Sequence, residues 1–226
     1  MNATPSPRPE RATAERATSS ALALASVTAV LKDLLENGLA ARGITSALGG
    51  DASVSALPPD RVPSGADERA QLNLFLYAVT PHTGLRVLRG GRDAGDARDA
   101  RNDVPRTPPL VLDLHYLLTA YGAQDFQAEI LLGHTMRLLH ERSVIERSEL
   151  RAVLGSLSSS MDGRIVPPAL AALAASDVPD RVERLTIAPA FPPFDEMSKL
   201  WSVLQARYRP SAAYRVSAVL IGGEAR

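Results

Sequence analysis

The chain has 226 residues, and its 25 lysines and arginines balance 25 aspartates and glutamates, so the formal net charge is zero. This balance argues against a protein that binds nucleic acid through a basic excess. The absence of cysteine excludes disulfides, thiolate nucleophiles and cysteine-based zinc sites. The length suffices for a substantial core, and we expect one domain over residues 20–223 with a short tail at 224–226.

The N-terminal segment is not expected to be a targeting signal. Residues 1–19 mix both charges with proline and lack a cleavage-site pattern, so we expect a disordered leader and no signal peptide. The apolar run at residues 21–31 is too short to span a bilayer and is followed at once by Lys32 and Asp33. We therefore expect no contact with a membrane and a soluble protein made in the cytoplasm.

The first predicted element is a helix. Its inner residues recur at helical spacing at Leu24, Thr28, Leu31 and Leu35. Ser19 or Ser20 can cap its start. We expect it to end at the Asn37-Gly38 pair or at Gly43, because glycine favours the backbone conformation that closes a helix.

Two strands are predicted next. Residues 52–57 form a short stretch that stops at two prolines. Residues 71–80 form a nearly continuous apolar and aromatic run bounded by turn residues. Such a run predicts a strand that is buried on both faces, near the middle of a sheet.

Residues 81–109 differ from their surroundings, being small, charged and proline-ended. A connection this long inside a compact domain is either functional or disordered. The clearest strand begins directly after it, with one face formed by Leu110, Leu112, Leu114, Tyr116 and Leu118. Asp113 and His115 share the other face, so the alternation predicts a strand with one side against a core.

The second half of the chain alternates helices and strands. In chain order we expect a helix at 125–140, a shorter helix at 147–157, an irregular region at 158–180 with one alanine-rich turn, a strand at 181–189, a helix beginning at Asp195 and a strand at 212–222. Ser148 and Asp195 are the expected N-caps. Trp201 is expected to be a buried anchor of the last helix, together with Met197, Leu200, Leu204 and Tyr208.

These elements define a fold class. Four to five strands interleaved with three to four helices predict a single mixed sheet with helices packed against it, an α/β or α+β architecture. The sequence shows no internal repeat.

Asp113 and His115 are the first candidates for catalysis. They lie two residues apart on one strand face, so the carboxylate could orient the imidazole as a general base requires. The sequence offers no third partner, and a polar pair on a solvated or interface face needs no catalytic role. His134 and His140 are six residues apart on one helix, which does not match the four-residue spacing of a helical zinc pair.

Other catalytic signals are missing. The serine-rich stretch at 156–163 contains no Gly-x-Ser-x-Gly elbow, and the glycine pairs belong to no phosphate-binding fingerprint. We therefore expect a protein that is not an enzyme and that holds neither a metal nor a cofactor.

The loop at 81–109 interleaves opposite charges. Its arginines are Arg86, Arg89, Arg92, Arg98, Arg101 and Arg106, and its aspartates are Asp93, Asp96, Asp99 and Asp103. In an isolated monomer such a loop is solvated and mobile. In an assembly it can order on a partner through arginine–carboxylate pairs, at a cost of a few kcal/mol. These arginines, with Asp113 and His115, are the candidate partner-binding residues.

Several segments of the chain resemble one known family. They are "LNLFLYAVTPH" (72–82), "PPLVLDLHYLLTAYG" (108–122), "ILLGHTMRLLHE" (130–141), "RLTIAP" (184–189) and "EMSKLWSVLQARYRPSAAYRVSAVLI" (196–221). Their succession resembles the cap or tail-terminator family of extracellular contractile injection systems. These are phage-tail-like particles with a sheath, an inner tube and a baseplate. The resemblance covers residues 21–221.

The resemblance implies a terminator-like fold and a structural role at the end of the particle distal to the baseplate. Phage tail terminators form six-fold rings on the last layer of sheath and tube. The implied partners are therefore sheath and inner-tube proteins and further copies of this chain, most simply as a hexamer. The implied location is the cytoplasm during assembly and then the particle itself, which can be extracellular. The resemblance implies no catalytic residues.

A ring of this kind requires two different patches on each subunit. Polar strand faces, such as those with Asp113 and His115 or Arg215 and Ser217, can supply such patches, and an edge strand can pair with extended arms of the sheath. Two alternatives stay open from the sequence. One is a baseplate or tube adaptor of the same particle, and the other is a small hydrolase or ligand-binding domain that uses Asp113 and His115.

Overall fold

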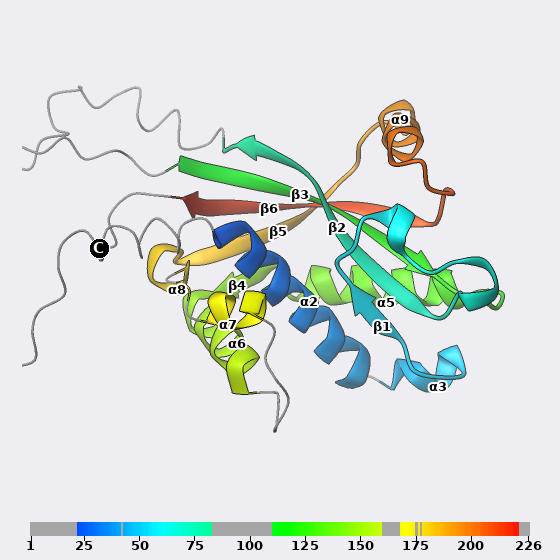
Figure 1. The fold of residues 1–226 in the computed structure, drawn as a ribbon, viewed down its shortest axis with the longest axis horizontal. Coiled ribbons are helices and arrows are strands. Elements are labelled where there is room, and N and C mark those ends of the chain that lie inside the picture. The colour runs from blue at the N-terminus through cyan, green and yellow to red at the C-terminus, as the bar shows by residue number, and fades with distance from the viewer. Residues whose placement is uncertain are drawn as a thin grey trace, which may run out of the picture.

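A computed structural model of the protein describes residues 22–41, 43–82, 110–159, 168–174, 176 and 178–221 (Figure 1). The expected leader at 1–19 and the tail at 224–226 lie outside these residues. So do the proposed caps Ser19 and Ser20, and all but the first two residues of the loop at 81–109.

One mixed sheet organises the described residues. Its six strands are β1 (Ser53–Ser55), β2 (Gln71–Pro81), β3 (Leu110–Tyr121), β4 (Val144–Glu146), β5 (Arg184–Ala190) and β6 (Ser211–Ile221). They lie in the order β1-β2-β3-β6-β5-β4, antiparallel except for the parallel pair β1–β2. The expected mixed sheet is confirmed with one strand more than the four to five expected. Strand β4 was not predicted, because its three residues are too few to show a strand period.

Helices connect the strands. They are α2 (Ala23–Ala41), α3 (Ile44–Leu48), α5 (Gln127–Glu141), α6 (Arg147–Ser159), α7 (Pro168–Ala174), α8 (Val178–Arg181) and α9 (Phe194–Leu204), with 3-10 turns η1 (Pro59–Arg61) and η2 (Gly65–Asp67). The four longer helices are those predicted from the sequence. The short helices α3, α7 and α8 exceed the expected three to four, because segments of one or two turns carry little periodicity.

The described helices divide between the two faces of the sheet. Figure 1 shows α2, α5, α6, α7 and α8 on one side and α9 on the other. The core lies on the first side, where Leu114, Tyr116 and Leu118 of β3 are completely buried. The predicted inner face of β3 is thus confirmed. Its other face carries Asp113 and His115 near its start, and further along Leu117 and Thr119 are completely buried.

Helix α2 passes the Asn37-Gly38 pair and ends at Ala41, just before Gly43, whose φ is 61°. Gly38 serves close packing instead of termination. A Cβ atom there would lie 2.2 Å from Leu138 Cδ2 of α5, and the Gly38 carbonyl oxygen accepts a hydrogen bond from His134 Nε2 at 3.2 Å. The missing side chain therefore lets α2 and α5 approach each other.

A partly buried hydroxyl pair joins α2 to the centre of the sheet. Thr28 Oγ1 and Tyr116 Oη lie 2.8 Å apart, and Thr28 Oγ1 also donates to the carbonyl oxygen of Leu24 at 3.1 Å. Burial raises the pKa of the Tyr116 phenol, against a smaller opposing effect of its hydrogen bond with Thr28. The phenol therefore stays neutral and available for this bond.

Two predicted N-caps are wrong. Helix α6 begins at Arg147 directly after β4, so Ser148 lies inside it. Helix α9 begins at Phe194 with Pro193 at the capping position, so Asp195 lies in the first turn, where its charge complements the helix dipole. Trp201 is buried as expected, whereas Tyr208 follows the helix, is exposed, and meets the Trp201 ring edge-on at 5.5 Å between centroids.

Candidate functional site

Asp113 and His115 lie on the face of the sheet opposite the main helices. In the register of β2 and β3, Asp113 is opposite Thr80 and His115 is opposite Ala78. On the other side of β3, His115 is opposite Arg215 of β6. The two predicted residues therefore belong to a polar patch in the middle of the sheet. We call Thr80, Asp113, His115 and Arg215 the β3 polar patch.

Two separate pairs replace the expected contact between Asp113 and His115. His82 Nδ1 donates a hydrogen bond to Asp113 Oδ1 at 2.7 Å, and Thr80 Oγ1 and His115 Nε2 lie 2.8 Å apart. Asp113 is buried and His82 is partly exposed. The carboxylate thus orients the imidazole of His82, a residue that the sequence analysis did not single out.

The sequence hides His82 because the pairing depends on strand register. His82 precedes Asp113 by 31 residues. A β-bulge between Leu76 and Ala78 shifts the register by one residue before the two strands reach Asp113. One feature of the sequence could have suggested His82 as a candidate residue: it follows the β2 run directly, where the loop at 81–109 begins.

The surroundings of His115 are aromatic and partly desolvated. The Tyr77 and His115 ring centroids lie 6.1 Å apart, with the rings tilted by 59°. Burial raises the pKa of the Tyr77 phenol, and the nearby Glu196 carboxylate of α9 raises it further. The patch therefore presents neutral and charged donors and acceptors side by side, a mixture suited to contacts with another protein.

The same patch offers little for catalysis. An oriented imidazole such as His82 needs a nucleophile or a bound substrate within reach to act as a base. The hydroxyl of Thr80 is instead engaged with His115. In the described part of the chain, no group of three or more histidine, aspartate or glutamate side chains is placed to hold a metal ion.

Helix α9 adds exposed aromatic side chains beside the patch. Phe194, the first residue of the helix, is 81% exposed, Phe191 just before it is 83% exposed, and Val203 near its end is similarly exposed. Large apolar side chains that gather at one place on a surface often mark an interaction site.

The six candidate arginines of the loop lie outside the described residues. The points where the loop leaves and re-enters the sheet are nevertheless described. Pro81 of β2 is opposite Leu112 of β3, and His82 N donates to Val111 O at 2.9 Å. The loop therefore begins and ends beside the His82–Asp113 pair.

The fold and this surface together define the class of protein: an α+β domain with one helix-covered sheet face and one face that is partly open and polar. Within the described residues, each helix is too short or too polar to traverse a lipid bilayer. The chain belongs to the Pvc16 N-terminal domain family, whose family model matches residues 26–226. The family recognised in the sequence is thereby confirmed.

Two solved structures resemble the protein. One is the sheath/tube terminator of the extracellular contractile injection system PVC in its extended state (18% identity, TM-score 0.45, covering 86% of this chain and 57% of that one). The other is the tube-terminating cap of the anti-feeding prophage (18% identity, TM-score 0.43, covering 84% and 56%). This chain thus spans little more than half the length of either relative. The curated proteins include no match.

Proposed function

We propose that the protein is a structural cap, or tail terminator, that closes the baseplate-distal end of a contractile injection system. The observation that carries the proposal is the family match over residues 26–226. In this role the protein binds the last layer of sheath and inner tube and ends their polymerisation. It is assembled in the cytoplasm and then remains part of the particle, which can be extracellular.

The cap acts as a ring, most simply a hexamer. A closed ring needs two different patches on each subunit. The β3 polar patch and the exposed aromatic residues around α9 lie on the face of the sheet that the main helices leave open, and we assign them to contacts between subunits or with the sheath. The protein is not an enzyme in this proposal. The two separate pairs of Asp113 and His115 favour a binding surface over a hydrolase.

Cryo-electron microscopy of particles purified with and without the protein tests the proposal. With the protein, we expect a closed ring at the end opposite the baseplate and a narrow distribution of particle lengths. Without it, we expect ragged or overlong ends, because nothing stops the addition of sheath and tube layers. Intact ends of normal length without the protein would refute the terminator role, and density at the other end would favour a baseplate adaptor.

The arginines of the loop at 81–109 are proposed to contact the neighbouring proteins. Replacing all six with glutamine should abolish ring density on the particle, because charge-assisted pairs with carboxylates would be lost. The matched control replaces Asp93, Asp96, Asp99 and Asp103 with asparagine and should retain the ring. Normal ring density and normal length in the arginine variant would remove the loop from the interface.

A further inference from the structure

The outer edge of β2 is covered over only part of its length. Strand β1 pairs with Gln71, Leu72 and Asn73 of β2 and goes no further. Beyond that point β2 continues to Pro81, paired with β3 on its inner side. In the described part of the chain, no strand lies on the outer side of this stretch. We call residues 74–81 the open edge, and its existence corrects the prediction that β2 lies near the middle of the sheet.

The direction of the backbone amide groups follows from two hydrogen bonds. Ser53 N donates to Ala70 O at 3.3 Å, so Ala70 faces β1, whereas His82 N donates to Val111 O and faces β3. Amide groups alternate in direction along a strand, and the bulge between Leu76 and Ala78 changes their parity. The N–H groups that point outward are therefore those of Leu74, Leu76 and Val79. The parallel pairing of Ser55 with Asn73 already engages the Leu74 N–H, so Leu76 and Val79 present the free donors of the open edge.

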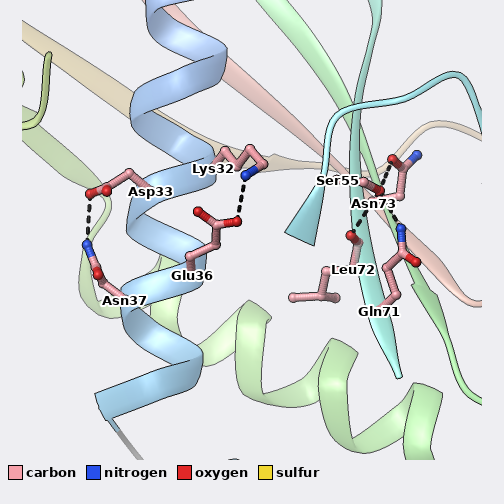
Figure 2. Close-up of polar contacts among 8 residues, drawn as sticks. All are labelled: Lys32, Asp33, Glu36, Asn37, Ser55, Gln71, Leu72 and Asn73. Carbon is pink, nitrogen blue, oxygen red and sulfur yellow. Dashed lines mark hydrogen bonds and ion pairs between the residues drawn. The ribbon is translucent and has the colours of Figure 1, made fainter. Parts of the chain in front are cut away.

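Asn73 ends the pairing of β1. Its side-chain Nδ2 donates to Leu57 O at 2.9 Å, and its Oδ1 accepts from Leu57 N at 3.0 Å and from Ser55 Oγ at 2.8 Å. Figure 2 shows Ser55 beside the Asn73 amide at the end of β1. The Asn73 side chain thus binds the backbone N–H and C=O of Leu57. Those two groups are then not available to extend the pairing of β1 with β2. The edge is left open by a specific, buried contact.

An apolar groove runs beside the open edge, between β2 and α2. Its volume is about 370 Å³, and its lining includes Ala25, Ala29 and Lys32 of α2, Leu74 and Leu76 of β2, and Leu173 of α7. The two alanines leave room above the helix. Figure 2 shows that Lys32, paired with Glu36 at 2.5 Å, projects from the side of α2 that is turned toward β1 and β2.

We propose that the open edge and this groove accept an extended strand from a partner protein. The strand lies along β2 beyond the segment that follows β1 and hydrogen-bonds to the outward groups of Leu76 and Val79. Side chains alternate along a strand, so every second residue of the partner enters the apolar groove. The segment that fits is free of proline and carries aliphatic side chains at alternate positions. The proposal deepens the proposed function, since the partner is then a subunit of the particle.

Selection from a phage-displayed library of random peptides tests the edge on the purified full-length protein. We expect the selected peptides to be alternately apolar and free of proline. Leu76→Pro removes an outward N–H and places a ring in the path of the added strand, so it should weaken their binding about tenfold or more. Leu76→Ala keeps the backbone group and should bind within about threefold of the wild type.

The test requires that the Leu76→Pro variant remain folded, and its thermal unfolding curve checks this. Ala29→Trp serves as a second variant, because it fills the groove and leaves the β2 backbone unchanged. Peptides without the alternating pattern, or peptides that bind both variants as well as the wild type, would overturn the strand-acceptor proposal. The proposal would also be overturned if no selected peptide bound the Leu76→Ala variant.

A particle experiment separates this proposal from the proposed function. The chain has no cysteine, so Val79→Cys and Met136→Cys each accept a single photo-crosslinker. The two sites are matched in exposure at 41% and 39%, and Met136 lies on α5, none of whose residues line the groove. We expect Val79→Cys alone to crosslink an extended segment of another subunit. Capped particles without this crosslink refute the strand acceptor, whereas peptide binding by a protein absent from the particle end refutes the cap.

Discussion

Replacing Leu118 with alanine is expected to lower the free energy of unfolding by about 2–5 kcal/mol. Leu118 is completely buried in the centre of β3, opposite Leu74 of β2 and Ala212 of β6. The substitution removes apolar contacts and leaves a cavity that two paired neighbouring strands cannot readily close. Urea unfolding followed by circular dichroism measures the change.

The matched control is Leu110→Ala on the same strand. Leu110 is 52% exposed, so the control should change the free energy of unfolding by no more than about 0.5 kcal/mol. For a chain of this size, each kcal/mol corresponds to roughly 2–4 °C in Tm. Equal losses in the two variants would contradict the assignment of the inner face of β3.

Replacing Glu68 with alanine is expected to destabilise the protein by about 2–4 kcal/mol. Its carboxylate joins two segments distant in sequence, because Oε2 accepts from Arg209 Nη2 at 2.6 Å and Oε1 accepts from Gly122 N at 3.3 Å. The Glu68 side chain is only 7% exposed and that of Arg209 is 25% exposed. Its loss therefore leaves a poorly solvated guanidinium, which also lies 5.7 Å from the centre of the Tyr121 ring.

Glu36→Ala provides the comparison, because Glu36 also belongs to an ion pair, with Lys32. The side chains of that pair are 37% and 46% exposed, so water replaces the lost contact, and we expect a change of about 0.5 kcal/mol or less. Thermal or urea unfolding at low and high salt distinguishes the two. If Glu68→Ala lowers the free energy of unfolding no more than Glu36→Ala does, the partly buried Glu68–Arg209 pair stabilises the protein no more than the exposed Lys32–Glu36 pair.

Local patterns predicted the long elements well. The alternation after residue 110 and the helical stripe at 125–140 correspond to β3 and α5, because each repeats its period several times. The short elements β4, α3 and α8 were not predicted, since packing against the rest of the fold decides them. Of the two expected ends of the first helix, Gly43 lies just past the end of α2, whereas Gly38 lies inside it, because the role of Gly38 depends on Leu138, a residue far along the chain.

Candidate sites were harder to predict than elements. Asp113 and His115 were correctly placed on one face of a strand. Their partners His82 and Thr80 depend on a bulge that no local pattern reveals. The open edge of β2 was missed because a continuous apolar run reads as a central strand, whether or not a second strand covers it.

By itself, the sequence determined the family, the mixed sheet and the course of the long helices and strands, because these depend on patterns that recur within short windows of the chain. Only the tertiary structure decided which side chains meet, where β1 stops and which edge of β2 stays open. Those outcomes depend on strand register and on contacts such as that of Asn73 with Leu57, between segments that the sequence separates.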